Sequence, residues 1–203
     1  MISVPLLFAA VIGFNHAFEA DHVLAVGNIA NGRKKLTLAI RDGFYWGLGH
    51  TSMILLIGLL IIMVKSLLTT FPFDFIEVFV GASLIGLGAY RLFKKKDHEH
   101  NTESESAHSH KMAYSIGLIH GLAGSGAVVL LAMSELEAGF ESIIYLLLFG
   151  CGSIIGMMIV AGLFNLPFSK KIKVTKTLQT VFLKLSAVLC IGYGAYMMVS
   201  YFT

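Results

Sequence analysis

The chain has 203 residues, of which 56% are hydrophobic and only 13% are charged, and its formal net charge is +3. A soluble domain carries about a quarter charged residues, so this composition excludes an ordinary soluble domain. Several apolar runs reach the roughly 20 residues that cross a bilayer as a helix. The basic residues lie in short loops beside these runs, a pattern that gives no indication of nucleic-acid binding.

Apolar runs separated by polar or proline-containing loops predict an all-α polytopic membrane protein with six transmembrane helices. The predicted helices cover roughly 3–29, 43–64, 74–93, 112–134, 142–165 and 179–202. The loops that follow the first, third and fifth helices, together with Arg91 at the end of the third helix, hold 13 of the 15 Lys and Arg residues. By the positive-inside rule these loops are cytoplasmic, and both termini lie outside.

The first predicted helix carries four ionisable residues between apolar runs: His16, Glu19, Asp21 and His22. An Asp at the centre of a membrane helix costs about 2.5–3.5 kcal/mol, so such a group indicates a functional site. On an unbroken helix, at about 100° per residue, Asp21 lies outside the stripe formed by the other three together with Asn15. An unwound turn brings Asp21 to the histidines directly, and the sequence does not choose between the two arrangements.

The second and fourth predicted helices carry one histidine each, His50 and His120. A rise of about 1.5 Å per residue places both, together with His22, roughly 10–14 Å below the cytoplasmic boundary, with His16 somewhat deeper. Imidazoles with one or two carboxylates suit borderline divalent cations such as Ni2+, Co2+ or Zn2+. A further carboxylate can fix the tautomer of a ligating histidine. The alternative is that these histidines make polar contacts between helices and bind no metal. This alternative is strongest for the isolated His120.

Residues 94–111, between the third and fourth helices, form a polar loop that is predicted to be disordered without a ligand. This loop holds four histidines: His98, His100, His108 and His110. Alternating His–x–His pairs beside acidic residues indicate metal capture on the cytoplasmic side. A solvated linker with incidental histidines is the alternative interpretation.

The two halves of the chain are similar to each other. Three stretches align at an offset of 103–106 residues: GFNHAFEADHVLAV from Gly13 with GLIHGLAGSGAVVL from Gly117, GLGH from Gly47 with GCGS from Gly150, and GLGAY from Gly86 with GYGAY from Gly192. Because each half has three helices, residues 1–93 and 112–203 are predicted to form a 3+3 inverted repeat. Such repeats are typical of secondary transporters, whose substrate site lies near the midplane at the repeat interface.

HAFEADH at 16–22 fits the pattern H-x4-D-H, and LGHTSM at 48–53 and GLIHGLAGSGA at 117–127 accompany it. With these motifs the chain resembles the nickel/cobalt permease family over all six spans. It is most similar to the short six-span branch, which resembles the nickel transporter found beside urease genes. The resemblance implies that His16, Asp21 and His22 are metal-site residues and that His50 lies close to them.

The chain departs from the family at two places. Glu19 stands where family members usually carry Asp, which keeps the charge but lengthens the side chain. GLAGSGA replaces the acidic motif expected on a later helix of the longer permeases, so their substrate specificity and transport direction are not carried over.

These features predict secondary transport of Ni2+ or Co2+ as substrate, with uptake as the expected direction, and neither an enzyme nor a prosthetic cofactor. The predicted metal site comprises His16, Asp21, His22, His50, Glu19, His120 and Asn15. The expected partners are the metal ion and the lipid bilayer of a prokaryotic cytoplasmic membrane, with no nucleic acid. A cytoplasmic metal acceptor or chaperone and a homo-oligomer stay open.

Other functions remain as alternatives. The same site can serve nickel or cobalt efflux, and paired membrane histidines can hold haem in an electron carrier. A thiol electron carrier is disfavoured because Cys151 and Cys190 lie in one half without counterparts. The chain has no H-E-x-x-H for an intramembrane metalloprotease and no G-x-x-x-x-G-K-[ST] for a nucleotide-driven pump.

Overall fold

The computed structural model describes residues 4–31, 33, 35–63, 74–93, 102–123, 140–168 and 174–202. All regular structure in these ranges is helical, so the prediction of an all-α protein is confirmed for the described part of the chain. The helices are α1 (Val4–His16), α2 (Ala20–Ala30), α3 (Leu36–Met63), α4 (Asp74–Phe93), α5 (Thr102–Ala123), α7 (Phe140–Asn165), the short 3-10 helix η1 (Leu166–Phe168) and α8 (Lys176–Phe202).

Three stretches among the described residues are long and apolar enough to cross a membrane: Leu36–Leu60, Phe140–Phe168 and Lys176–Phe202. Large apolar side chains such as Leu56 and Val188 are exposed on the outside of these helices. Such contiguous apolar surface is unfavourable in water and is covered by lipid in a bilayer. The chain is a membrane protein.

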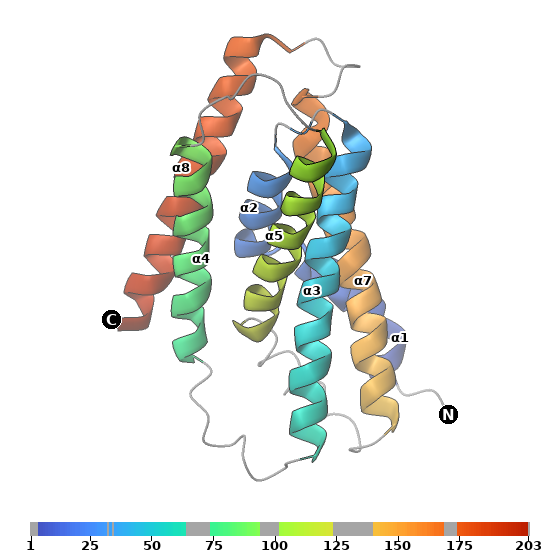
Figure 1. Cartoon of the computed structure of the whole chain (residues 1–203). Coiled ribbons are helices and arrows are strands. Elements are labelled where there is room, and N and C mark those ends of the chain that lie inside the picture. Colours follow the sequence, from blue (N-terminus) through green and yellow to red (C-terminus); the bar gives the residue numbers. More distant parts are fainter. Residues whose placement is uncertain are drawn as a thin grey trace.

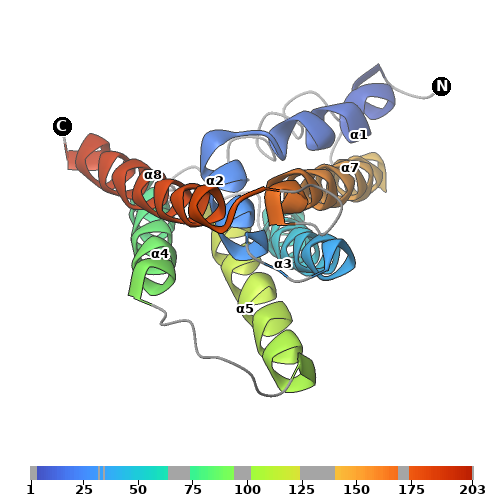
Figure 2. The same cartoon turned by 90° about the horizontal axis from the view of Figure 1, so that it is seen from above.

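The long helices α3, α4, α5, α7 and α8 alternate in direction in chain order along one bundle, so the spatial neighbours α3 and α5 are parallel (Figure 1). Seen from the end, α2 occupies the middle of the bundle, α1 lies at its edge beside α7, and α4 pairs with α8 on one side (Figure 2). The short central helix α2 contacts α3, α4, α5, α7 and α8. A residue on α2 is therefore within reach of side chains from most of the fold.

The first predicted helix, 3–29, is interrupted at its ionisable residues. Helix α1 ends at His16 and α2 begins at Ala20, while Glu19 between them is extended, with φ −62° and ψ 150°. The Glu19 amide donates to the His16 carbonyl at 3.1 Å, which closes a tight turn. The single continuous helix is thus wrong, and the unwound turn is the arrangement found. It places Asp21 in the first turn of a new helix, where the helix dipole favours a negative charge.

Two helices begin seven or more residues earlier than predicted. Helix α3 starts at Leu36 instead of residue 43. Residues 102–111, expected to be part of a disordered loop, are helical and form the start of α5. No Gly or Pro interrupts this segment, so the helix extends backward from its apolar part. The His110 ring then stacks on Tyr45 of α3, with ring centroids 4.9 Å apart. The predicted ends at residues 64 and 134 lie outside the described residues.

Glycines allow the helices of the two halves to approach closely. A Cβ atom at Gly13 would collide with the carbonyl oxygen of Phe149 on α7, and one at Gly117 would collide with the carbonyl oxygen of Trp46 on α3. Only glycine fits such backbone contacts. These two positions therefore set how closely α1 packs on α7 and how closely α5 packs on α3.

Candidate metal centre

Four histidines from four different helices converge inside the bundle. His16 ends α1, His22 lies on α2, His50 on α3 and His120 on α5, and each is at most 4% exposed. The His22 ring is the hub: its centroid lies 4.4 Å from that of His16, 4.9 Å from His50 and 5.9 Å from His120. One ring nitrogen from each of His16, His22 and His50 lies within 4.8 Å of the others. These three form the centre of the site, with His120 beside them.

Three of these rings are held by their Nδ1 atoms. Nδ1 of His16 lies 2.8 Å from Oε1 of Glu19, and Nδ1 of His22 lies 2.8 Å from Oδ1 of Asp21. Nδ1 of His120 lies 3.0 Å from the carbonyl oxygen of Ile116. Carboxylate and carbonyl oxygens accept hydrogen bonds, so each Nδ1 carries the proton and donates it. In the neutral ring, Nε2 is then left with its lone pair.

The remaining ring nitrogens have no hydrogen-bond partner among the described residues. They are Nε2 of His16, His22 and His120, and both nitrogens of His50. Buried polar atoms in proteins are almost always paired, and each unpaired one costs about 1–3 kcal/mol. The ring nitrogens of His16, His22 and His50 that lie within 4.8 Å of one another therefore indicate a ligand. Lone pairs of imidazole nitrogens suit a first-row divalent transition metal.

The two acidic residues of the motif stand outside the histidine cluster and support it. The side chain of Asp21 is 15% exposed and that of Glu19 is 54% exposed. Each contacts the Nδ1 atom of a histidine, an arrangement that fixes the tautomer and ring orientation of metal-ligating histidines. Oxygen atoms of Glu19 and Asp21 also lie within 4.8 Å of a nitrogen of His22, so these three residues could hold an ion themselves.

Asn15, the remaining residue of the predicted site, is exposed at the end of α1. Its place on the predicted stripe depended on a continuous helix, and the turn after His16 removes that alignment. The structure therefore brings together His16, His22, His50 and His120, with the two carboxylates behind them, and leaves Asn15 on the surface.

Two buried aromatic residues lie at the site that were not among the predicted site residues. Trp46 packs against His22, His50 and His120, and Phe149 packs against His16. A usable sequence signal does exist, because Trp46 and Phe149 directly precede the aligned glycines of GLGH and GCGS.

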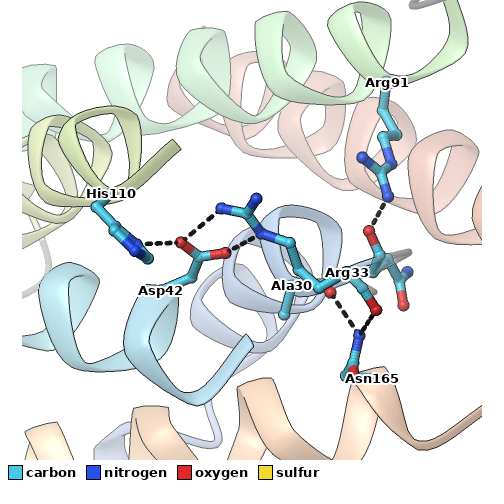
Figure 3. Close-up of polar contacts among 7 residues, drawn as sticks. Ala30, Arg33, Asp42, Arg91, His110 and Asn165 are labelled. Carbon is cyan, nitrogen blue, oxygen red and sulfur yellow. Dashed lines mark hydrogen bonds and ion pairs between the residues drawn. The ribbon is translucent and has the colours of Figure 1, made fainter. Parts of the chain in front are cut away.

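The end of α2 that lies away from the histidines is fixed by a polar network (Figure 3). The Arg33 guanidinium donates to both carboxylate oxygens of Asp42, at 2.5 and 2.9 Å. Nδ1 of His110 lies 2.7 Å from Oδ1 of the same carboxylate. Asp42 is 1% exposed, so this is a buried ion pair that joins the α2–α3 connection to α5.

Four further hydrogen bonds hold the same end of α2. Arg91 of α4 donates to the carbonyl oxygen of Asn31. The Asn165 amide of α7 donates to the carbonyl oxygens of Ala30 and Arg33, both at 3.1 Å, as Figure 3 shows. The Asn31 amide donates to Oγ of Ser186 on α8 at 2.8 Å. The helix that carries His22 is thus tied to five others.

The histidines of the 94–111 segment are only partly covered by the described residues. His98 and His100 lie outside them, and the side chain that is described is that of His110. It is 8% exposed and contacts Asp42. His110 is therefore a structural contact here, and metal capture by the segment stays a prediction.

A relative with an assigned role shows the family to which the chain belongs. The urease accessory protein UreH of Bacillus sp. (strain TB-90) is 34% identical over 208 aligned positions, which cover 95% of this chain and 90% of the relative. The chain belongs to the family of this urease accessory protein. The resemblance to the urease-associated branch of the nickel/cobalt permeases is thereby confirmed. No family model and no solved structure matches the chain.

The family membership also bears on the class of protein. The relative is named as an accessory protein and not as an enzyme. The expectation that the chain is not an enzyme agrees with this assignment.

Proposed function

We propose that the chain transports a divalent transition-metal ion, Ni2+ and/or Co2+, across the cytoplasmic membrane, in the direction of uptake. The observation that carries the proposal is the cluster of four buried histidines whose Nε2 atoms lack partners among the described residues, while an acceptor holds Nδ1 in three of them. Inside a membrane protein, such a group binds a cation that otherwise could not leave water.

Nickel is the first ion to test. The relative is a urease accessory protein, and the short permeases that the sequence resembles are similar to the nickel transporter found beside urease genes. Inward movement of a divalent cation across an inside-negative membrane gains about 4.6 kcal/mol per 100 mV, twice the value for a unit charge. The membrane potential alone is therefore sufficient to drive accumulation.

Reciprocal contacts support a 3+3 inverted repeat. Gly13 contacts Phe149, and Gly117 contacts Trp46. The alignment pairs Gly13 with Gly117 and Phe149 with Trp46, so each contact is the counterpart of the other in the opposite half. In the same way Gly81 approaches Gly194 while Gly88 approaches Ala187, both across the α4–α8 interface. A pseudo-two-fold axis between the halves accounts for both pairs, and it places the histidines at the interface of the repeats.

In the proposed topology the chain has six spans with both termini outside, and the network around Asp42 lies at the cytoplasmic end. Alkaline phosphatase fused after Thr203 is expected to be active, whereas green fluorescent protein fused there is expected to remain dark. A fluorescent fusion would overturn the orientation.

The decisive experiment compares wild type and His22→Ala in proteoliposomes with an inside-negative potential and external Ni2+ or Co2+. Wild type is expected to accumulate metal, and His22→Ala to lose at least 90% of this uptake because His22 is the hub of the cluster (about tenfold, or 1.4 kcal/mol). Undiminished uptake in the mutant would disprove the site.

Binding gives an independent measurement. Trp46 is the only tryptophan of the chain, and its ring lies 5.1 Å from that of His22. Bound Ni2+ or Co2+ is expected to quench its fluorescence in the purified protein. His110→Gln, which changes a buried histidine outside the cluster, is the control and should retain quenching.

Efflux by the same site is the second candidate, and vesicles of opposite orientation separate it from uptake. A haem-binding electron carrier is disfavoured by the geometry, because histidine rings 4.4–5.3 Å apart leave no room for a porphyrin between them. A Soret band in the purified protein would reopen that alternative.

A further inference from the structure

Two large aromatic side chains enclose the histidine cluster from different sides. Trp46 on α3 is 0% exposed; its ring lies nearly parallel to that of His50, at 8° and 5.4 Å, and meets the His120 ring at 5.3 Å. Phe149 on α7 is 1% exposed, and its ring lies 5.3 Å from that of His16. Neither side chain offers a metal ligand, so each acts as an apolar wall.

The two walls lie toward opposite ends of the bundle. Trp46 precedes His50 by one helical turn, about 6 Å, on the side of the connection between α2 and α3. Helix α7 is antiparallel to α3 (Figure 1). Phe149 precedes Ser153 by one helical turn, about 6 Å. Oγ of Ser153 donates to the carbonyl oxygen of Gly13 at 3.0 Å, three residues before His16 in α1. Phe149 therefore lies toward the end from which α1 enters.

The repeat makes the two aromatic residues counterparts. The alignment of GLGH with GCGS pairs Trp46 with Phe149, as the alignment of the first stretches pairs His16 with His120. The contact of Phe149 with His16 and that of Trp46 with His120 have the same centroid distance, 5.3 Å. An inverted repeat places counterparts on opposite sides of the membrane midplane.

We propose that Trp46 and Phe149 are the inner and outer gates of the metal path. The inference rests on the proposed transport function. Each ring closes one side of the site, because an apolar constriction excludes hydrated ions. Displacement of one ring opens the site to one side while the other ring keeps it closed, which is the requirement for alternating access without a continuous pore.

The test removes both rings. Proteoliposomes are loaded with a Mg2+-sensitive dye, and Mg2+, which prefers oxygen ligands and is a poor ligand match for a histidine site, is added outside. Trp46→Ala combined with Phe149→Ala is expected to admit Mg2+ at least tenfold faster than wild type, with a rate that rises linearly with concentration. Each single variant is expected to remain closed, because the other ring stays in place.

Two controls separate gating from damage to the fold. Leu84→Ala removes a fully buried side chain of α4, outside the cluster, and is expected to remain closed to Mg2+. The exchange variant, Trp46→Phe with Phe149→Trp, keeps an aromatic ring at both positions and is also expected to remain closed. If the double alanine variant does not elute as a single folded species, the pair Trp46→Ser and Phe149→Ser, whose side chains are small and polar, replaces it, with a leak again expected.

The outcomes distinguish the gates from the transport function. A double variant that is folded and as impermeable to Mg2+ as wild type overturns the gates, whatever wild type does with Ni2+. If only the double variant leaks Mg2+, the gates are supported. If wild type moves neither Ni2+ nor Co2+, the proposed substrate is overturned, and the gates are not. A leak in the Leu84→Ala control would also overturn the assignment.

Discussion

At the scale of single residues, the site depends on which histidine nitrogen carries the proton. Asp21 and Glu19 each accept from an Nδ1 atom, and this frees Nε2 of His22 and His16 for a metal. The carboxylates thus contribute through orientation as well as charge. This division of roles can be tested at each carboxylate separately.

Asp21→Leu removes the acceptor for Nδ1–H of His22, and we expect Ni2+ to bind about 10–100-fold more weakly. Asp21→Asn keeps an oxygen at the same place, so its Ni2+ affinity should fall clearly less than that of Asp21→Leu. Titration of Trp46 fluorescence measures both affinities. Equal losses in the two variants would show that Asp21 acts as a metal ligand and not through His22.

Glu19 is the position at which the chain departs from the permeases it resembles. Glu19→Asp shortens the side chain and should break the 2.8 Å contact with His16. We expect weaker metal binding and a changed preference between Ni2+ and Co2+, measured by competition of the two ions. Glu19→Gln, which preserves length, is the matched control, and an unchanged preference in Glu19→Asp would contradict this role.

At the scale of elements, the interruption between α1 and α2 is the central feature. It turns His16 and His22 toward each other, and it makes α2 a short helix that needs external support. The network at its far end supplies that support from α3, α4, α5, α7 and α8. The buried ion pair of Arg33 and Asp42 is the part of it that joins the α2–α3 connection to α3.

Asp42→Asn leaves the Arg33 guanidinium without its carboxylate. Breaking a buried pair costs roughly 3–5 kcal/mol, and we expect the lower end because the Arg33 side chain is 15% exposed. Thermal unfolding in detergent, followed by circular dichroism, should show a clearly lower midpoint. Lys111→Ala, beside His110 but exposed, should leave the midpoint unchanged. A wild-type midpoint in Asp42→Asn would mean that the network does not stabilise α2.

At the scale of the whole molecule, close contacts between helices recur in both halves. Gly13 and Gly117 are aligned counterparts, and each lies against a backbone carbonyl of the other half. Gly86 and Gly192 are also counterparts, but a Cβ atom at either position meets nothing within 4 Å. The fold therefore contains two pairs of aligned glycines. An added methyl group is expected to destabilise the fold at one pair and to be tolerated at the other.

We expect Gly13→Ala and Gly117→Ala to lower the unfolding midpoint to a similar extent, because each added methyl group forces two helices apart. Gly86→Ala and Gly192→Ala should be neutral or stabilising by up to about 1 kcal/mol, the difference in helix propensity. Thermal unfolding of the four variants tests this. If the two members of a pair behave differently, the two halves are not equivalent.

The sequence by itself determined the helical membrane class, the family and the identity of the histidines. These follow from apolar run length, charge placement and the H-x4-D-H pattern, which are local properties of the chain. It also predicted helix 74–93 with the bounds that α4 has. Asn15 was assigned to the site only because a continuous helix was assumed.

Only the tertiary structure decided how the motif is used. The break after His16 lets His16 and His22 meet rings of other helices, those of His50 and Phe149, and the free energy of a buried imidazole depends on what it contacts. Neither the pairing of Asp42 with His110 nor the placement of Trp46 and Phe149 around the cluster follows from local sequence. Both arise from contacts between residues distant in the chain, which periodicity and composition do not encode.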